Sequence, residues 1–496
     1  MTWVLFPTLP FLHSLNLPAP ILATAEAESG PMVVAAVLLS LVVIYFASKL
    51  GGEICARIDL PPVLGELVAG VIVGVSALHL LIFPEGGEDG SHSMIMAFLQ
   101  TTAHLNPEAV PHVFQSQGEV LAVLAELGVV ILLFEIGLES DLKELLRVGM
   151  QATVVAVVGV VAPFALGTAG LMLIFGVPSI PAIFAGAALT ATSIGITAKV
   201  LAELQRLSSR EGQIIIGAAV MDDVLGIIVL AVVASLARDG KVEVGNVIYL
   251  IISSGAFLIG SIWLGRLISP FLVDLINNMK TRGQLLLSAL IFAFILSYIA
   301  AVIQLEAILG AFAAGLILAE TEKQRELEEQ IIPIADMLMP IFFVVVGART
   351  DVGVLNPLVP ENREGLIMAS FLILVAIFGK VVTGLSVFGQ PGINRLAIGV
   401  GMIPRGEVGL VFASVGSSSG VLGKSLEAAI IVMVILTTFL SPPLLRIVFS
   451  KESDSSAEVP ALGDGKTEAV NLSPDMVELE QVEPDLYQPK PKNEAS

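Results

Sequence analysis

The sequence predicts an all-α polytopic membrane protein, with thirteen transmembrane helices that form two inverted repeats of six around one linking helix. Of its 496 residues, 55% are hydrophobic and only 14% are charged, and the mean hydropathy is +0.90. A soluble globular chain carries about 25% charged residues, so this chain has more apolar surface than a water-soluble core can bury. Its apolar residues also gather in runs of about 20, which is the length that crosses a bilayer.

Each apolar run predicts one spanning helix. The runs cover residues 32–50, 61–83, 120–138, 152–176, 181–202, 213–237, 246–272, 284–303, 305–320, 331–349, 365–388, 394–419 and 427–449. The ninth is short, and most connections are brief. The exception is 84–119, a polar segment without Lys or Arg in which His92, His104 and His112 are expected to be solvated rather than metal ligands.

The distribution of Lys and Arg predicts the orientation. With the N-terminus outside, the cytoplasmic loops and the C-terminal end carry fifteen Lys or Arg residues and the outside loops carry five. Basic residues concentrate on the cytoplasmic side of membrane proteins, so we expect the N-terminus outside and the C-terminus in the cytoplasm. A bacterial inner membrane and an internal, thylakoid-like membrane fit equally well.

Two interrupted helices fall at the same place in the two repeats. The fifth contains "ALTATSIGITAKV", which is rich in small and hydroxylated residues, and the twelfth contains "GVGMIPRGEVG", with Pro404 in mid-segment. An even-numbered repeat followed by one linking helix places the second repeat upside down. Interrupted helices at matching positions of inverted repeats are typical of the binding site of a secondary transporter.

The two ends of the chain differ from the membrane domain at 31–450. The segment 1–30 is expected outside the cytoplasm; its first 25 residues are apolar and signal-like but lack a positive start. The segment 451–496 holds 11 Asp or Glu against 4 Lys, which predicts an acidic disordered cytoplasmic tail. A single cysteine, Cys55, excludes an internal disulfide framework and a cysteine-rich metal site.

Asp222 and Asp223 stand side by side in the middle of the sixth apolar run. A charge at this depth costs roughly 2.5–3.5 kcal/mol even on a lenient scale, and Asp is too short to reach the interface. Adjacent helical residues point about 100° apart, so the two carboxylates are expected to have different partners. A purely stabilising role for both is disfavoured, because ion pairs in a low dielectric stabilise proteins poorly.

Four other charged residues interrupt apolar runs. Lys380 in the eleventh run is expected to pair with one of the aspartates and so stay charged. The others are Arg405 and Glu407 at the break in the twelfth run, which are candidates to neutralise the ends of the broken helices, and Glu135 near the cytoplasmic end of the third. Arg405 as an interfacial residue remains an alternative.

Glu66 lies in the first turns of the second apolar run, where a helix-terminal role is favoured over ion binding. For Glu135 the two alternatives stay open. We treat both as possible accessory residues of the site.

Midplane carboxylates beside hydroxyls and freed carbonyls make a pocket of oxygen ligands, which suits a hard monovalent cation. A carboxylate binds either a cation or a proton, so competition at one site produces exchange. The sequence contains no phosphate-binding loop, so an ion gradient is the expected energy source. We expect no cofactor and no nucleic-acid partner; the expected partners are monovalent cations, protons and the lipid bilayer.

Five motifs resemble one family. They are "PPVLGELVAGVIVG", "LLFEIGLE", "TATSIGITAKVL", "GAAVMDDVLGI" and "GMIPRGEVGLV". Together, in this order over most of residues 31–450, they are similar to the second branch of the monovalent cation:proton antiporters, the NapA- and KefC-like transporters. The resemblance implies a NapA-type fold of thirteen helices, two crossed broken helices and a homodimer. It also implies that this chain is not an enzyme.

The resemblance also implies residue roles. Asp223 matches the principal cation and proton carrier, and so the Na⁺ ligand, while Asp222 matches the residue that pairs with a lysine, here Lys380. Thr192 and Ser193 match the unwound stretch near the ion. Asp-Asp together with Lys suggests electrogenic exchange of Na⁺, or Li⁺, for H⁺.

Three alternatives remain beside this hypothesis. A K⁺/H⁺ antiporter on the same scaffold differs only in cavity size. A cation channel would need a continuous pore, which two broken helices suit less well than a carrier. An intramembrane protease would need its two aspartates on separate helices, whereas Asp222 and Asp223 are adjacent on one.

Overall fold

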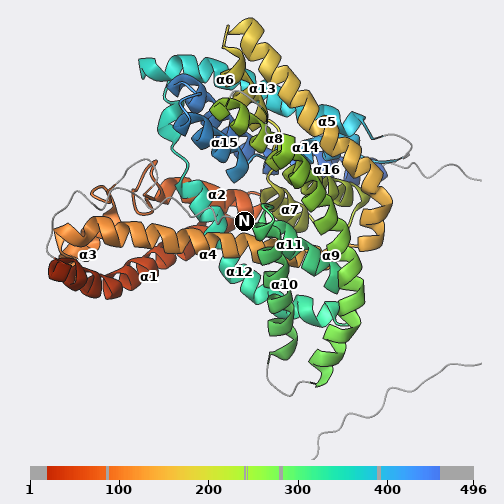
Figure 1. Ribbon diagram of the computed structural model, residues 1–496, viewed down its shortest axis with the longest axis horizontal. Coiled ribbons are helices and arrows are strands. Elements are labelled where there is room, and N and C mark those ends of the chain that lie inside the picture. The colour runs from red at the N-terminus through yellow and green to blue at the C-terminus, as the bar shows by residue number, and fades with distance from the viewer. Residues whose placement is uncertain are drawn as a thin grey trace, which may run out of the picture. The chain divides into compact units, whose positions relative to one another are not determined.

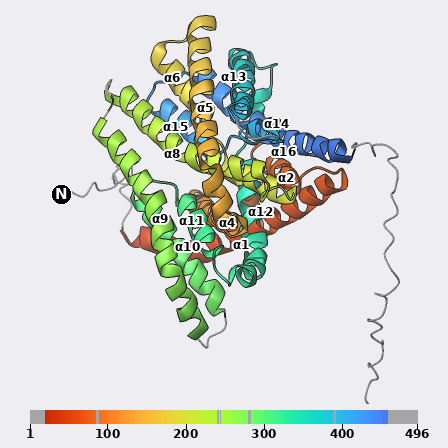
Figure 2. The same cartoon turned by 90° about the vertical axis from the view of Figure 1, so that its right-hand side faces the viewer.

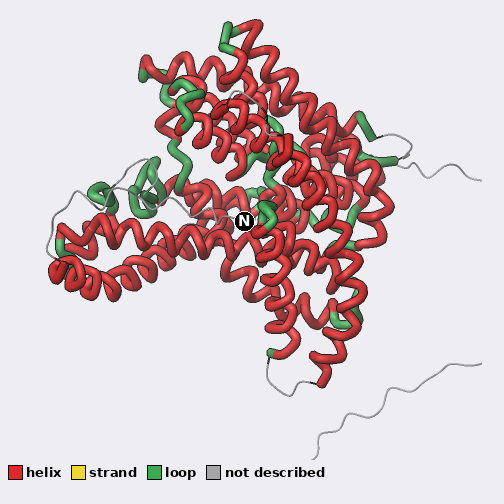
Figure 3. The backbone as a smooth tube through the Cα atoms, in the orientation of Figure 1, coloured by secondary structure: helices red, strands yellow, loops and turns green. Residues whose placement is uncertain are grey.

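The protein is described here by a computed structural model, which covers residues 19–84, 89–239, 242, 244–278, 283–387 and 392–457. These residues form helices, turns and loops, with no strand among them (Figure 3). The expected N-terminal segment lies partly, and the expected acidic tail mostly, outside the described residues.

A first group of helices packs together at α4 (Figures 1 and 2). In it, α4 contacts α1, α11 and α12, while α2 contacts α1 and α12. We call these helices, with α10, the first helix group. Its members are α1 (Ala19–Arg57), α2 (Pro62–Val73), α4 (Val110–Glu139), α10 (Gln284–Val302), α11 (Ala307–Leu318) and α12 (Gln324–Ala348).

A second helix group packs around α5, which contacts α6, α8 and α13 (Figure 1). Its members are α5 (Leu142–Ile174), α6 (Ser179–Ala188), α7 (Ile194–Glu203), α8 (Arg210–Asp239), α13 (Pro360–Leu385), α14 (Arg395–Gly401), α15 (Glu407–Ser418) and α16 (Lys424–Ala457). The long helix α9 (Val244–Asn278) contacts α8 of this group and α10 and α11 of the first. It therefore links the two groups.

Glycines occupy close helix crossings. A Cβ built on Gly65 of α2 would lie 2.0 Å from the Gly51 carbonyl oxygen of α1, and one on Gly137 of α4 would lie 2.4 Å from the Phe312 carbonyl oxygen of α11. Real Cβ atoms do not approach backbone this closely. Small residues at such crossings let helices pack by van der Waals contact where lipid supplies no hydrophobic drive.

The expected all-helical membrane fold is confirmed, but the count of thirteen spans is not. Nine of the described helices are long and apolar enough to cross a membrane, namely α1, α4, α5, α8, α9, α10, α12, α13 and α16. The other four expected spans correspond to α2, α11 and the pairs α6–α7 and α14–α15. Each of these helices is short: α2 has 12 residues, or about 18 Å of helix, against about 30 Å of hydrocarbon.

The polar connection before α4 is more ordered than its composition predicts. It contains α3 (Met94–Thr102), where Ser93 caps the first turn by accepting from the Met96 amide, and η2 (Pro107–Ala109). His112 lies within α4 rather than in a loop. The second expected span, 61–83, also differs from the structure, because its helix α2 ends at Val73. No group of three or more metal-ligating residues occurs in the part of the chain that the structure describes.

Candidate ion-binding site

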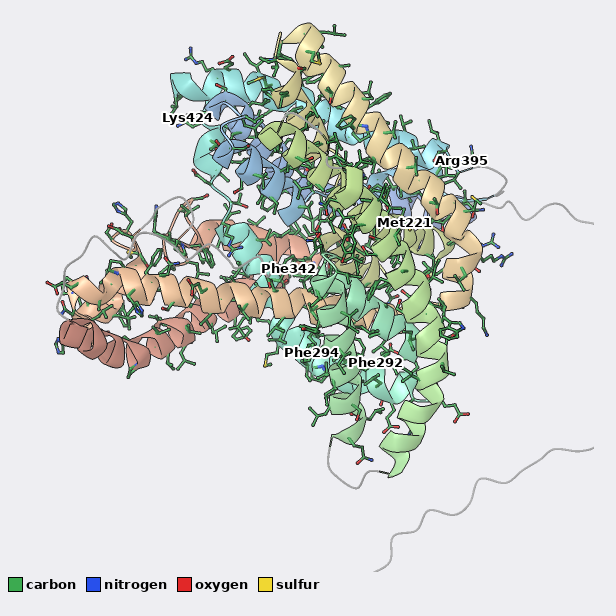
Figure 4. The ribbon with its side chains drawn as sticks, in the orientation of Figure 1. Met221, Phe292, Phe294, Phe342, Arg395 and Lys424 are labelled. Carbon is green, nitrogen blue, oxygen red and sulfur yellow. The ribbon has the colours of Figure 1, made fainter. Side chains whose placement is uncertain are left out.

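Two breaks in helices meet inside the second helix group. Residues 189–193 separate α6 from α7, and residues 402–406 separate α14 from α15. The first break begins where the Thr190 hydroxyl donates to the Ala187 carbonyl at 2.8 Å, a local bond that competes with the helix. The second contains Pro404, which has no amide hydrogen to continue a helix. Arg395 and Lys424, labelled in Figure 4, mark the first residues of α14 and α16.

Hydrogen bonds join the two breaks directly. The Ser193 amide donates to the Pro404 carbonyl at 2.8 Å, and the Thr192 hydroxyl donates to the Met402 carbonyl at 3.2 Å. Backbone groups freed by the unwinding are thus satisfied by the opposite break rather than by a helix.

The aspartate pair lies on α8 beside this crossing. Asp222 is fully buried and only 3% of Asp223 is exposed. Met221, which is labelled in Figure 4, directly precedes the pair on α8. Asp223 acts electrostatically on Lys380, but less strongly than Asp222 does. The two carboxylates therefore have unequal surroundings, as their different directions from the helix predict.

Lys380 reaches from α13 to both α8 and the first break. Its Nζ donates to Asp222 Oδ2 at 3.0 Å and to the Thr190 carbonyl at 2.7 Å, and the side chain is fully buried. Gly159 of α5 leaves room for the ammonium group, since a Cβ there would lie 3.2 Å from Nζ. This ammonium has one carboxylate and one helix-end carbonyl as partners.

Arg405 comes from the second break and points to the first. Its Nη1 donates to the carbonyls of Thr190 and Ala191, its own carbonyl accepts from the Thr438 hydroxyl of α16, and it is fully buried. Arg405 is therefore buried inside the protein rather than exposed on a loop. The carbonyls at the end of α6 carry partial negative charge, which this guanidinium and Lys380 oppose.

Some polar atoms around the crossing have no hydrogen-bond partner within the described residues. They are Ser193 Oγ, Asp222 Oδ1, and Arg405 Nε and Nη2. Buried polar groups without partners are costly, so their accumulation at one place is typical of a functional site rather than a packed core. The oxygens among them are suited to water or a hard monovalent cation.

Two of the remaining predicted residues, Glu66 and Glu135, lie on helices of the first group. The third, Glu407, starts α15, but its side chain lies outside the described residues. Glu66 on α2 accepts from the Ser48 hydroxyl at 2.9 Å, and Glu135 lies on α4. Both interact electrostatically with Lys199 on α7. The structure therefore groups Glu66 and Glu135 around Lys199, separate from the aspartate pair.

Sequence reasoning missed three contributions to the site. The Thr190 carbonyl accepts from both Lys380 and Arg405, Thr438 holds the Arg405 carbonyl, and Thr197 donates to the Gly401 carbonyl at 3.0 Å. The hydroxyl-rich composition of the fifth run was the signal for Thr197, whereas Thr190 contributes its backbone carbonyl, for which the sequence provided no signal. Thr438 lies in an ordinary apolar helix, and its surrounding sequence carried no signal of this role.

The four buried charged groups at the crossing balance. Asp222 and Asp223 can each carry one negative charge, and Lys380 and Arg405 can each carry one positive charge. Such a site can gain either a proton or a monovalent cation on one carboxylate with the same change in charge. This is the electrostatic condition for exchanging one for the other.

Comparison with known proteins decides the family. A family model described as "Sodium/hydrogen exchanger, transmembrane" matches residues 19–451. This chain belongs to the sodium/hydrogen exchanger family. The exchanger is 68% identical over 447 residues to the "High-affinity Na(+)/H(+) antiporter NhaS3" of Synechocystis sp., covering 89% of this chain and 97% of the relative.

Two further comparisons concern one more relative and one solved structure. The "Na(+)/H(+)-K(+) antiporter GerN" of Bacillus cereus is 30% identical over 82% of this chain and 94% of the relative. The solved structure of the sodium proton antiporter MjNhaP1 from Methanocaldococcus jannaschii is similar with a TM-score of 0.54 at 16% identity, over 86% of this chain and 98% of that one. The similarity to MjNhaP1 shows that the two chains share a fold.

Proposed function

We propose that this exchanger moves Na⁺, or Li⁺, across a membrane in exchange for H⁺, with Asp223 as the group that binds the cation or the proton. The observation that carries the proposal is the buried aspartate pair on α8 beside two joined helix breaks, with Lys380 held by Asp222. Family membership and the 68% identity to a Na⁺/H⁺ antiporter support it.

The proposed exchange follows from the charges at the crossing. Ionised Asp223 with Na⁺ bound and protonated Asp223 without Na⁺ give the site the same net charge, so the two ligands compete for one carboxylate. Alternating access then moves the second helix group, which holds the breaks, against the first. Thr192 and Ser193 are proposed to offer oxygens to the cation.

We propose that exchange is electrogenic. If Lys380 also gives up its proton when Na⁺ binds, the site with Na⁺ is neutral and two protons leave for one cation. The aspartate pair and the fully buried Lys380 support this, because the sequence resemblance links that combination to electrogenic exchange. Transport that does not respond to membrane potential would remove this part of the proposal and the proton-carrying role of Lys380.

Transport by the purified protein tests the proposal. In vesicles containing a pH dye, Na⁺, Li⁺ and K⁺ are compared side by side for proton flux. Asp223→Asn should abolish flux, whereas Asp351→Asn, an exposed cap of η3 (Val352–Leu355), should not. Flux at the wild-type rate in Asp223→Asn would reject the assignment.

A K⁺/H⁺ antiporter is the second candidate, because the 30% identical relative from Bacillus cereus is described as a Na⁺/H⁺-K⁺ antiporter. Proton flux driven by K⁺ at least as well as by Na⁺ in the same vesicles would favour it.

The expected assembly and orientation also remain proposals. We propose a homodimer, which the resemblance to the NapA-type fold implies and native mass spectrometry tests. We propose an outside N-terminus and a cytoplasmic C-terminus, which the excess of Lys and Arg in alternate loops supports. Protease access to a C-terminal tag in sealed vesicles tests this orientation.

A further inference from the structure

Thr438 of α16 makes a contact that its neighbour Thr437 does not make. Both side chains are buried. The Thr437 hydroxyl donates to two carbonyls of its own helix, at 2.8 Å to Met433 and at 3.1 Å to Val434. The Thr438 hydroxyl instead donates to the Arg405 carbonyl in the second break. Threonine within a helix commonly bonds back to its own helix, so the bond made by Thr438 is a feature of this crossing rather than of helix geometry.

Thr438 supplies the donor for a carbonyl that a continuous helix would have satisfied. The first break and α7 donate to three earlier carbonyls of the second break region, which are those of Gly401, Met402 and Pro404. These three bonds leave the Arg405 carbonyl without a partner. In a continuous helix the Gly409 amide would donate to it, but this amide donates to the Gly406 carbonyl at 3.1 Å. The Thr438 hydroxyl therefore takes the place of a helical amide.

Arg405 is held at its backbone by α16 and at its side chain by the first break. Its Nη1 donates to the carbonyls of Thr190 and Ala191, which follow the end of α6. One residue thus connects α16 with both breaks. A change in the direction of the Arg405 backbone would also move the base of the side chain that joins the breaks.

The same peptide lies against the Ser193 hydroxyl. The Arg405 carbonyl and the Gly406 amide belong to one planar peptide, so holding the carbonyl also fixes the position of Gly406. A Cβ built on Gly406 would lie 2.8 Å from Ser193 Oγ. That oxygen has no hydrogen-bond partner within the described residues, and it is one of the oxygens proposed above to bind the cation.

We propose that Thr438 is a positioning residue for the cation site. Its hydroxyl holds the peptide between Arg405 and Gly406 where the backbone leaves Ser193 Oγ free to bind Na⁺. Without the hydroxyl, this peptide turns toward another donor and shifts against Ser193, so the cation binds more weakly. Thr438 acts through the peptide and not as a ligand, and the inference rests on the transport proposed above.

Thr438→Val removes the hydroxyl and nearly keeps the shape of the side chain. The KM for Na⁺ should rise about tenfold while the maximal rate changes less than about twofold, because a buried acceptor loses its donor and ground-state binding is weakened. Thr438→Ser keeps the hydroxyl and should have the wild-type KM. Thr437→Val is the matched control, since it removes an equally buried hydroxyl that bonds within its own helix, and its KM should also equal that of wild type. Thr438→Ala repeats the test if Thr438→Val does not fold.

Amide hydrogen exchange tests the positioning without transport. The Ser193 amide joins the breaks by donating to the Pro404 carbonyl, so it should exchange faster in Thr438→Val than in Thr437→Val. Equal exchange in these two variants, or faster exchange in Thr438→Val with an unchanged KM, would reject the proposal. If the difference in exchange appears but Asp223→Asn transports Na⁺ at the wild-type rate, the proposed role of Asp223 fails and the hold of Thr438 on the break stands.

Discussion

Lys380 donates a hydrogen bond to Asp222 across 3.0 Å where neither side chain is exposed to solvent. The same ammonium donates to the Thr190 carbonyl in the broken helix, and Arg405 donates to that carbonyl too. One aspartate is therefore tied to the break through a lysine, which leaves Asp223 as the carboxylate proposed to bind the ion. The predictions below separate this structural pairing from the chemistry at Asp223.

Breaking the Lys380–Asp222 pair should destabilise the fold. Loss of one member of a buried pair costs about 3–5 kcal/mol, because the other charge stays buried without compensation. Asp222→Asn should be the more damaging change, since Lys380 and Arg405 then face each other, whereas Lys380→Met leaves Arg405 near Asp222. Thermal unfolding in detergent measures both.

The double variant Asp222→Asn/Lys380→Met serves as the control. It removes both charges, so its melting temperature should recover toward wild type relative to the worse single variant. Additive losses from the two substitutions would show that the pair has no coupling energy and would contradict this account of the contact.

Arg405→Met should loosen the crossing of the two breaks. It leaves the Ala191 carbonyl without its guanidinium donor, and an unsatisfied buried acceptor costs about 1–3 kcal/mol. Arg405→Lys keeps the charge with less reach and should be intermediate. Melting temperatures of the three proteins test the order, and a Met variant as stable as wild type would argue that Arg405 contributes nothing to joining the breaks.

Ser193→Ala tests whether the crossing supplies a ligand to the ion. The Ser193 hydroxyl has no hydrogen-bond partner among the described residues, so its loss should cost little stability but raise the KM for Na⁺ about tenfold, the effect of roughly 1.4 kcal/mol. Ser140→Ala is the matched control, because that buried hydroxyl donates to the Ile136 carbonyl away from the crossing. An unchanged KM in Ser193→Ala would exclude the hydroxyl as a ligand.

Gly137→Val should separate α4 from α11. The added Cβ would lie 2.4 Å from the Phe312 carbonyl oxygen, and overpacking of this kind costs about 1–3 kcal/mol or more. Gly149→Ala in α5 has nothing within 4 Å of its added Cβ and should be neutral or slightly stabilising. Equal melting temperatures for the two variants would contradict the close crossing.

The sequence was sufficient to predict the helical class and the breaks, because lipid imposes helix length and hydropathy on each span. It also placed Lys380 and the aspartate pair as exceptions in apolar runs. The neighbours of Glu66 and Glu135 were not predictable, since which helices surround Lys199 depends on packing. The second apolar run likewise does not reveal that α2 ends at Val73, because the turns after it are equally apolar.

Contacts made by backbone atoms were also beyond sequence reasoning. The Thr190 carbonyl accepts from two buried cations, and the Val63 amide donates to Glu203, yet neither role depends on its side chain. Hydropathy and motif spacing carry information about side chains but not about the partners of backbone groups. Only the folded arrangement shows which freed backbone groups lie within reach of which charges.

Binding of radioactive ²²Na⁺ to the purified protein tests the central claim most directly, because it needs neither movement nor a proton gradient. Asp223→Asn should bind no Na⁺ above background at a pH where wild type binds it, with its helical content unchanged. Wild-type binding of Na⁺ by Asp223→Asn would contradict the assignment of Asp223 as the cation-binding carboxylate.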